Sequence, residues 1–216
     1  MKTSRAKFPG AAQFISPGAT LNVLGDEVQD CKGCDLYRAA TQAVFGEGQR
    51  RARMVMVGEQ PGDKEDLAGK PFVGPAGQLL DRALADAGID RADVYLTNAV
   101  KHFKFEERGK RRIHKKPLSA EIAACKPWLE AEFDRIKPDL IVCLGATAAQ
   151  SVIGRQHRLL EQRGLFFAHA QAPGVTATVH PSAILRSPTP EQREQDYADF
   201  VGDLKKARRR LEDIAE

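Results

Sequence analysis

The fold of this chain is decided by the stretch MVMVG at residues 54–58, a short apolar run that ends in glycine. Such a run is typical of a buried parallel strand. It is followed by AGQLLDRALADA at 76–87, whose apolar spacing predicts a helix that stops at Gly88. Residues 94–100 (VYLTNAV) predict a second strand. Together these segments predict one right-handed crossover unit of a parallel sheet.

The same alternation continues to the end of the chain. We expect strands at 140–144 and 175–179, and helices at 119–136, from 146 onward and at 190–213. Four strands that alternate with helices predict an α/β fold whose central, mostly parallel sheet is covered on both faces. The Pro- and Gly-punctuated residues 1–25 predict a loosely packed arm. We expect one domain over residues 1–216.

The composition is that of a soluble globular protein, with 42% hydrophobic and 29% charged residues. The longest apolar runs, such as 140–146, are too short to cross a bilayer. The N-terminus lacks the apolar core of a signal peptide. We therefore expect a cytoplasmic protein without a membrane segment. In a reducing compartment, the four cysteines are better explained as metal ligands or free thiols than as disulfides.

Residues 101–116 (KHFKFEERGKRRIHKK) carry the basic excess of the chain. They contain eight Lys or Arg and two Glu, a local charge of +6, whereas the whole chain carries +4, so the remainder sums to −2. Cations this dense are typical of a contact for phosphates. His114 lies among them and is a candidate reactive group. The alternative is a solvated loop whose histidine has no chemical role.

Polar residues follow the predicted strands at the edge where parallel sheets bind their ligands. Glu59 and Asp63 come after the first strand in a Gly/Pro loop, where backbone N–H groups can approach a ligand closely. Asn98 lies near the end of the second strand, His180 follows the fourth, and Phe72 offers a flat surface for stacking. Singly these signals are weak, because each residue has an ordinary alternative role in a turn or in the core.

The cysteines form a possible metal site. Cys31 and Cys34 are a C-x2-C pair, which lets two thiolates reach one ion from a single turn. Cys125 and Cys143 follow far along the chain, with 17 residues between them. The four together suit zinc or an iron–sulfur cluster, and the spacing does not choose between them. The alternative is that Cys125 and Cys143 are buried apolar residues.

Four motifs occur in a fixed order: GEQPGDKED at 58–66, GKPFVGPAGQLLD at 69–81, TNAVK at 97–101 and HPSA at 180–183. With the cysteines, this order resembles the family 4 uracil-DNA glycosylases over most of the chain. The resemblance implies a three-layer α/β/α sandwich. It also implies a [4Fe-4S] cluster whose ligands are Cys31, Cys34, Cys125 and Cys143.

Two features depart from the usual family 4 pattern. The first glycine-rich motif usually reads GEGPG, and Gln60 replaces its central glycine here. The second is the loop KRRIH at 110–114, which ordinary members lack. Both features are similar to UdgX, a subgroup that removes uracil and then becomes covalently attached to the DNA through the histidine of this loop. The resemblance therefore implies that His114 attacks the sugar.

The chemistry of uracil suggests roles for the other polar residues. The amide of Asn98 can pair with uracil N3–H and O4 but not with cytosine. Phe72 would stack on the ring. By the resemblance, His180 would donate a hydrogen bond to O2, where negative charge develops, and Glu59 would hold the tautomer of His114.

The remaining predicted residues orient groups or bind DNA. Asp63 would orient a water molecule or steady the sugar cation. Gln60 would contact uracil and, with Arg112, fix the loop over the site. Contacts to DNA phosphates, which position DNA without reading its sequence, are expected from Lys110, Arg111, Arg112 and Ser182.

The expected function is excision of uracil from DNA, followed by a covalent bond between His114 and deoxyribose C1′ in a single turnover. The partner would be single-stranded DNA or a nucleotide flipped from the duplex, and the protein would act as a monomer. An ordinary turning-over family 4 enzyme, with the basic loop as a DNA clamp, is the first alternative. A non-catalytic iron–sulfur DNA-binding module is the second.

Overall fold

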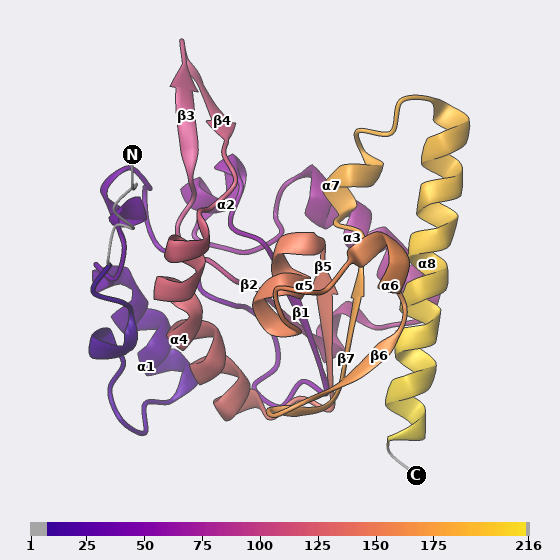
Figure 1. The fold of residues 1–216 in the computed structure, drawn as a ribbon, viewed down its shortest axis with the longest axis horizontal. Helices are drawn as coiled ribbons and strands as arrows, with labels where there is room; N and C mark the ends of the chain where they lie inside the picture. Colours follow the sequence, from indigo (N-terminus) through magenta and orange to yellow (C-terminus); the bar gives the residue numbers. More distant parts are fainter. Residues whose placement is uncertain (1–7, 215–216) are drawn as a thin grey trace.

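A five-stranded sheet forms the centre of the computed structural model, which describes residues 8–214 (Figure 1). The strands lie in the order β2 (Val94–Asn98), β1 (Met54–Gly58), β5 (Leu140–Leu144), β7 (Ala172–Thr178) and β6 (Phe166–His169). The first four run parallel, and β6 pairs antiparallel with β7. The predicted α/β class and the mostly parallel sheet are confirmed.

The predicted number of four strands is wrong, because β6 gives little signal in the sequence. This strand lies at the edge of the sheet, is only four residues long and exposes alternate positions. Two predicted strands also have different bounds. β2 ends at Asn98 rather than at residue 100, and β7 spans Ala172–Thr178 rather than 175–179.

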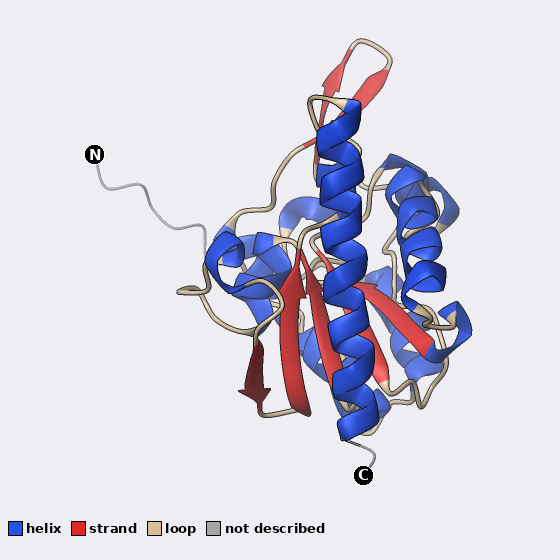
Figure 2. Cartoon of the chain, turned by 90° about the vertical axis from the view of Figure 1, so that its right-hand side faces the viewer, coloured by secondary structure: helices blue, strands red, loops and turns tan. Residues whose placement is uncertain are grey.

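Helices cover both faces of the sheet because successive residues of a strand point to opposite sides. Met54 and Met56 of β1 pack into one apolar cluster, whereas Val55 and Val57 pack into the other. The first face carries α3 (Pro75–Ala87), α7 (Pro181–Ile184) and α8 (Pro190–Asp213), and the second carries α4 (Ser119–Ile136) and α5 (Ala146–Val152). Figure 2 shows α8 lying lengthwise across its face of the sheet.

The long helices begin and end close to the predicted residues. α3 has Pro75 at its first position and is followed by a C-terminal cap at Gly88, whose φ of 72° is left-handed. At the start of α4, the carboxylate of Glu121 accepts a hydrogen bond from the backbone N–H of Leu118 at 2.6 Å. The C-terminal cap of α4 is Lys137, which has a φ of 53°. No helix in the described part of the chain is long and apolar enough to cross a membrane.

The first described residues are packed, which corrects the prediction of a loose arm as far as residues 8–25 are concerned. Residues 1–7 lie outside the described residues. Ala11 and Leu24 are fully buried, and the backbone N–H of Ala11 donates to the carbonyl of Ala124 in α4 at 2.8 Å. The remaining short elements are α1 (Leu21–Glu27), α2 (Asp63–Ala68), α6 (Leu159–Gln162) and the 3₁₀ turns η1 (Ala12–Phe14), η2 (Val28–Asp30), η3 (Asp35–Arg38) and η4 (Arg91–Asp93).

The basic segment contains a β-hairpin rather than a simple loop. β3 (Phe105–Arg108) and β4 (Arg111–His114) pair antiparallel, and Gly109 in the turn has a left-handed φ of 59°. Glu106 and Lys115 form an ion pair across the hairpin at 2.6 Å. The hairpin projects beyond the carboxyl ends of the parallel strands (Figure 1). This position holds the last residue of β4 over the edge of the sheet.

Candidate active site

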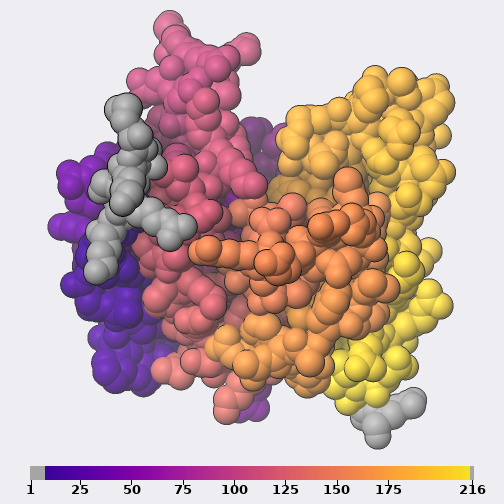
Figure 3. All heavy atoms as spheres, in the orientation of Figure 1, coloured from indigo at the N-terminus to yellow at the C-terminus, as the bar shows by residue number. Residues whose placement is uncertain are grey.

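A cavity of about 740 Å³ opens at the carboxyl ends of the parallel strands. Loops that follow β1, β5 and β7 line it, β2 contributes its last residue, and the hairpin contributes one residue. In the space-filling view, the hairpin and the segment after β7 stand on either side of a hollow (Figure 3). The structure brings together eight predicted site residues at this cavity: Glu59, Gln60, Asp63, Phe72, Asn98, His114, His180 and Ser182.

The imidazole of His114 lies beside the carboxylate of Glu59. Nε2 of His114 is 3.3 Å from Oε1 of Glu59, and half of the His114 side chain is exposed. Burial alone would raise the pKa of Glu59, but hydrogen bonds from His114 and Thr147 outweigh burial and hold this pKa below its ordinary value. Glu59 is therefore ionised at neutral pH, and its oxygen can accept the N–H of a neutral imidazole.

The ring of His180 is held by Ser182. Nδ1 of His180 accepts a hydrogen bond from the backbone N–H of Ser182 at 3.1 Å, and the Ser182 hydroxyl lies 2.8 Å from the same nitrogen. Burial lowers the pKa of His180 to about 4, so the ring is neutral at physiological pH. Because Nδ1 is an acceptor, the proton of the neutral ring is on Nε2. Ser182, predicted to contact DNA, orients this donor.

Phe72 lines the cavity in a backbone conformation that is unusual for its residue type. Its φ of 57° lies in the left-handed region, which costs free energy for a residue with a Cβ. Its ring is stacked near that of His180, with 6.1 Å between centroids and 25° between planes. Gly77 permits this arrangement, because a Cβ there would lie 1.6 Å from the carbonyl oxygen of Phe72.

Asn98 ends β2 opposite Gly58, the last residue of β1. The residue is 3% exposed and lines the cavity. Its backbone carbonyl accepts a hydrogen bond from Nζ of Lys101 at 2.9 Å. The strand end and this buried cation thus fix the backbone from which the Asn98 side chain reaches the cavity wall.

Gln60 holds the base of the hairpin. Its Nε2 donates to the backbone carbonyls of Lys104 at 3.1 Å and Lys115 at 3.0 Å, and its Oε1 accepts from the backbone N–H of Lys104 at 3.1 Å. Lys104 precedes β3 and Lys115 follows β4, so one amide joins both ends of the hairpin. The polar atoms of Gln60 thus bind the hairpin, and its assignment to uracil binding stays a prediction. The predicted role in fixing the loop agrees with these contacts.

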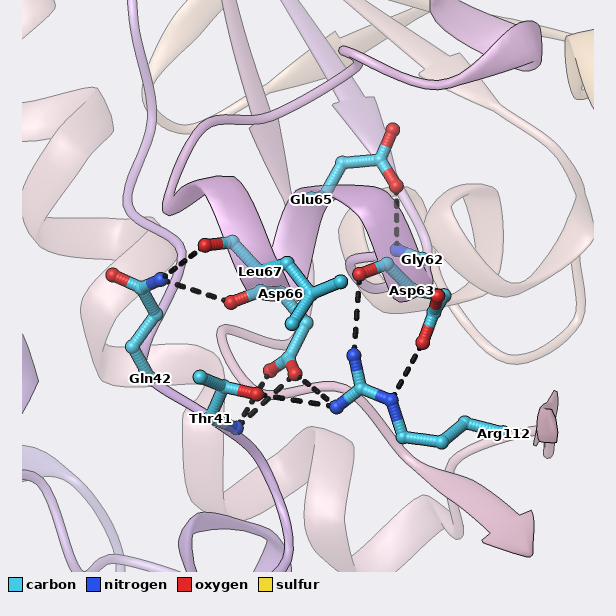
Figure 4. A network of polar contacts seen from close by, with 8 residues as sticks. All are labelled: Thr41, Gln42, Gly62, Asp63, Glu65, Asp66, Leu67 and Arg112. Carbon is cyan, nitrogen blue, oxygen red and sulfur yellow. Dashed lines mark hydrogen bonds and ion pairs between the residues drawn. The ribbon is translucent and has the colours of Figure 1, made fainter. Parts of the chain in front are cut away.

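Arg112 ties the hairpin to α2 (Figure 4). Its Nε donates to Oδ1 of Asp63 at 2.6 Å. Its Nη1 donates to Oδ2 of Asp66 at 2.6 Å and to the hydroxyl of Thr41 at 3.2 Å. The side chain of Arg112 is only 19% exposed, so its guanidinium is occupied by the protein. The predicted contact of Arg112 with DNA and the predicted role of Asp63 stay predictions, and in the structure each has the other as an ion-pair partner.

Three cations of residues 101–116 remain available for a ligand. Five of the eight are in ion pairs: Lys101, Lys104, Arg108, Arg112 and Lys115. Within residues 8–214, the exposed Lys110, Arg111 and Lys116 form no ion pair with another residue. These three are the cations of the segment that the protein itself does not neutralise by an ion pair, within the described residues.

Several residues of the site are missed by the sequence reasoning. Thr147 of α5 donates a hydrogen bond to Glu59, and Arg186 lines the cavity after α7. Glu65 accepts hydrogen bonds from the backbone N–H groups of Gly62 at 3.1 Å and Gly74 at 2.7 Å, which joins the two glycine-containing loops. A signal for Glu65 was present, because it lies three residues after Gly62 in the spacing of a capping box.

The structure gathers three of the four cysteines. Cys31, Cys34 and Cys125 belong to one apolar cluster beside the N-terminal part of α4. Nε1 of Trp128 donates to Sγ of Cys31 at 3.2 Å. Cys143 lies in the middle layer on β5, in a different cluster under α4 and α5. The predicted set of four thiolate ligands therefore stays a prediction, with Cys143 in a different apolar cluster from the other three.

The three gathered cysteines are buried thiols, two of which resist loss of their protons. Burial raises the pKa of Cys125 to about 12, and nearby Cys34 and Cys31 raise it further, against the lowering effect of Lys101. Burial likewise raises the pKa of Cys34. Thiolates crowded in an apolar site repel one another, and iron or zinc ions would compensate this charge.

The fold and the cavity define an α/β sandwich protein whose ligand site lies at the carboxyl ends of its parallel strands. A family model described as the uracil DNA glycosylase superfamily matches residues 45–205. The chain belongs to this superfamily.

Curated relatives agree with this membership. A type-4 uracil-DNA glycosylase of Thermotoga maritima is 38% identical over 174 residues, which cover 80% of this chain and 87% of that protein. A type-4 uracil-DNA glycosylase of Archaeoglobus fulgidus is 36% identical over 187 residues, with 82% and 89% covered. A type-5 uracil-DNA glycosylase of Pyrobaculum aerophilum is 29% identical over 157 residues, with 63% and 64% covered.

Proposed function

We propose that this protein is a uracil-DNA glycosylase that excises uracil and then joins His114 to C1′ of the deoxyribose. Membership of the superfamily and the printed activity of its type-4 relatives support the first part. One observation carries the second part. The hairpin holds the His114 imidazole at the cavity, with Nε2 3.3 Å from an ionised Glu59. A histidine in this position can act on whatever sugar the cavity admits.

Uracil would enter the cavity between Phe72 and Asn98. Stacking of a base on an aromatic ring contributes about 1–3 kcal/mol, which helps to offset the cost of unstacking the nucleotide. The Asn98 amide would accept from uracil N3–H and donate to O4. Cytosine reverses both groups, so it would leave the buried amide unpaired. The pocket therefore selects uracil by hydrogen bonding rather than by size.

Cleavage of the C1′–N1 bond leaves the electron pair on uracil and positive charge on the sugar. The negative charge spreads to uracil O2, where Nε2–H of neutral His180 would donate a hydrogen bond. A preorganised donor aimed at developing charge lowers the barrier without reorganisation. Because the pKa of His180 is lowered to about 4, this donor acts as a neutral imidazole throughout the physiological range.

Capture of the sugar cation would use the lone pair of the His114 nitrogen that does not face Glu59. The new bond from nitrogen to C1′ converts the ring into an imidazolium. Its other proton then passes to the Glu59 carboxylate and on to water, while the uracil anion takes a proton from solvent. Glu59 would thus hold the reactive tautomer before attack and take up the proton afterwards.

DNA would be held chiefly by the free cations of the hairpin. Lys110 and Arg111 lie at its exposed tip, and Lys116 follows it. Phosphate contacts of this kind position DNA without reading its sequence.

A [4Fe-4S] cluster would have Cys31, Cys34 and Cys125 among its ligands. When bound, the cluster would crosslink residues near the N-terminus to α4 and take no part in the chemistry. Its colour separates it from zinc, because an iron–sulfur protein is yellow-brown and a zinc protein is colourless.

A denaturing gel tests the covalent step. We expect wild-type protein incubated with uracil-containing single-stranded DNA to give a shifted band that resists heat and SDS. His114→Ala should lack this band. His169→Ala is the matched control, because His169 lies on β6 outside the cavity lining, and it should keep the band. A wild-type protein without the band contradicts covalent capture.

The same reactions distinguish the alternative functions. Strand breakage after alkali without a covalent band would indicate an ordinary turning-over glycosylase. Binding of DNA without release of uracil would indicate a non-catalytic module. If His114 only takes the place of water, His114→Ser and His114→Gly should release uracil with turnover and leave free abasic DNA. Complete loss of uracil release in both variants would mean that His114 acts in bond cleavage itself.

A further inference from the structure

One carboxylate joins two loops of the cavity wall. Oε2 of Glu65 accepts a hydrogen bond from the backbone N–H of Gly62 at 3.1 Å, and its Oε1 accepts one from the backbone N–H of Gly74 at 2.7 Å. We infer that Glu65 is a positioning residue that sets where Phe72 meets the base. This inference rests on the proposal that uracil stacks on Phe72, and it does not depend on covalent capture by His114.

The carboxylate of Glu65 serves the backbone rather than a cation. Asp63 and Asp66 lie on the same short helix, α2, and both pair with Arg112. Within residues 8–214, by contrast, the half-buried Glu65 forms no ion pair. Each of its oxygens accepts an N–H from a different loop, so Glu65 fixes the spacing of the two loops.

The backbone angles of Gly62 and Gly74 do not require glycine. Their φ values of −90° and −86° are open to any residue. A Cβ on Gly62, however, would lie 2.6 Å from Oε2 of Glu65, and a Cβ on Gly74 would lie 3.0 Å from Oε1. Either Cβ would push the carboxylate away, because the carboxylate ends a flexible side chain. Glycine at both positions therefore allows the close approach that the two hydrogen bonds need.

The same contacts fix the starts of two helices. Gly62 is the N-cap residue of α2, and Gly74 is the N-cap residue of α3. The first N–H groups of a helix have no partner within the helix, and glycine has no side chain to supply an acceptor. Glu65 accepts from the cap of its own helix, as in a capping box, and also from the cap of α3. One carboxylate thus sets the start of α3 relative to that of α2.

Phe72 depends on this arrangement because its backbone is strained. It lies two residues before Gly74, and its φ of 57° is left-handed. Such a conformation costs free energy and persists only where the surrounding structure imposes it. The carbonyl of Phe72 lies against Gly77 of α3, and the hydrogen bond from Gly74 to Glu65 fixes the start of that helix. Loss of this hydrogen bond would let the strained loop relax and move the Phe72 ring.

Single-turnover release of uracil tests the positioning role. Glu65→Gln keeps the shape of the side chain but has one acceptor oxygen, so one of the two hydrogen bonds is lost. We expect release to slow by about tenfold to a hundredfold. Free uracil should inhibit this variant several-fold more weakly, because stacking is impaired. Glu27→Gln is the matched control and should keep the wild-type rate, since Glu27 accepts the backbone N–H of Ser16 at 3.2 Å outside the cavity lining.

A double-mutant cycle shows whether Glu65 acts through Phe72. Phe72→Ala should slow the release of uracil by itself. Adding Glu65→Gln to Phe72→Ala should slow release by less than about twofold more, because the ring that Glu65 positions is absent. A general loss of structure would instead multiply the two effects, and multiplied effects would overturn the inference.

Gly74→Ala covers the case in which Glu65→Gln does not fold. This variant keeps Glu65 but puts a Cβ against its carboxylate, so it should also slow release and weaken inhibition by free uracil. A folded Glu65→Gln or Gly74→Ala variant with the wild-type rate rejects the positioning role. If wild-type protein releases uracil and Phe72→Ala is equally fast, the stacking role of Phe72 and the inference fail while the activity stands. Wild-type protein that releases no uracil rejects the proposed activity and the inference together.

Discussion

Gly58 shows how the cavity depends on a missing side chain. It ends β1 directly beside Asn98 of β2. A Cβ at this position would lie 2.3 Å from Oδ1 of Asn98 and 2.9 Å from Cζ of Phe72. The backbones of both residues are fixed, because Gly77 lies against the carbonyl of Phe72 and Lys101 donates to the carbonyl of Asn98. The side chains of Asn98 and Phe72, which are proposed to recognise uracil, therefore both lie against Gly58, where a larger residue would displace them.

We predict that Gly58→Ala lowers the rate of uracil release by about a hundredfold, since a misplacement near 1 Å has effects of this order. Gly202→Ala is the matched control. A Cβ at Gly202 in α8 meets no atom within 4 Å, so this variant should keep the wild-type rate. Release of uracil is measured under single-turnover conditions. A Gly58→Ala variant as fast as Gly202→Ala would show that Asn98 and Phe72 do not form the uracil pocket.

The hairpin of β3 and β4 is an element with two different faces. Arg111 and Arg112 are adjacent on β4, and successive residues of a strand point to opposite sides. Arg112 turns toward Asp63 and Asp66 and holds the hairpin to α2, as Figure 4 shows. Arg111 is exposed to solvent. One strand thus supplies a structural tie, a candidate DNA contact and, at its end, His114.

Substitutions at Arg111 and at Arg112 distinguish contact with DNA from attachment of the hairpin to α2. Arg112→Met should slow covalent capture by about tenfold to a hundredfold, because a loosened hairpin misplaces His114. Arg111→Met should leave the rate of capture at saturating DNA unchanged. It should weaken binding and reduce the slope of log affinity against log salt by about 0.7, as expected for one lost phosphate contact on a single strand. A reduced salt slope with normal capture in Arg112→Met would instead make Arg112 a DNA contact.

Across the whole molecule, one buried ion pair connects the sheet, α4 and the segment before β1. Lys101 and Glu132 are fully buried and 2.5 Å apart. Glu132 also accepts hydrogen bonds from the hydroxyls of Tyr95 and Thr97 and from the backbone N–H of Gly46. Through Glu132, this network holds β2 against α4. The last residue of β2 is Asn98.

We predict that Lys101→Met lowers the free energy of unfolding by about 3–5 kcal/mol, because it leaves the Glu132 carboxylate buried without a counter-charge. The double variant Lys101→Met/Glu132→Leu should recover part of this loss, since removing both charges removes the uncompensated one. Denaturant unfolding followed by circular dichroism gives the comparison. A single variant within 1 kcal/mol of wild type would mean that the carboxylate is protonated or solvated in the fold.

The sequence allowed correct prediction of the parallel strands and the long helices, because their signals are local. A short apolar run such as 54–58 indicates a buried strand, and the residue after it lies at the ligand edge wherever the strand is in the sheet. Eight predicted residues accordingly line one cavity. β6 escaped prediction because an edge strand that is half exposed has no such pattern.

The roles of Gln60, Arg112 and Cys143 could not be predicted in the same way. The atoms that occupy Gln60 belong to Lys104 and Lys115, which are 44 and 55 positions away along the chain. Counting four cysteines gave no indication that β5 directs Cys143 into a different apolar cluster. In each case, the available partners depended on the packing of segments that are distant in sequence.

The sequence by itself determined the α/β class, the positions of the parallel strands and the polar residues at their carboxyl ends. These properties follow from the periodicity and chemistry of neighbouring residues. Only the tertiary structure decided which of those side chains are free to meet a ligand. The side chains of Gln60 and Arg112, and most cations of residues 101–116, form hydrogen bonds or ion pairs within the protein. The side chains of His114, His180 and Asn98 line the cavity instead. Burial and pairing are properties of the packed chain, and they separate a structural tie from a reactive group of the same chemical type.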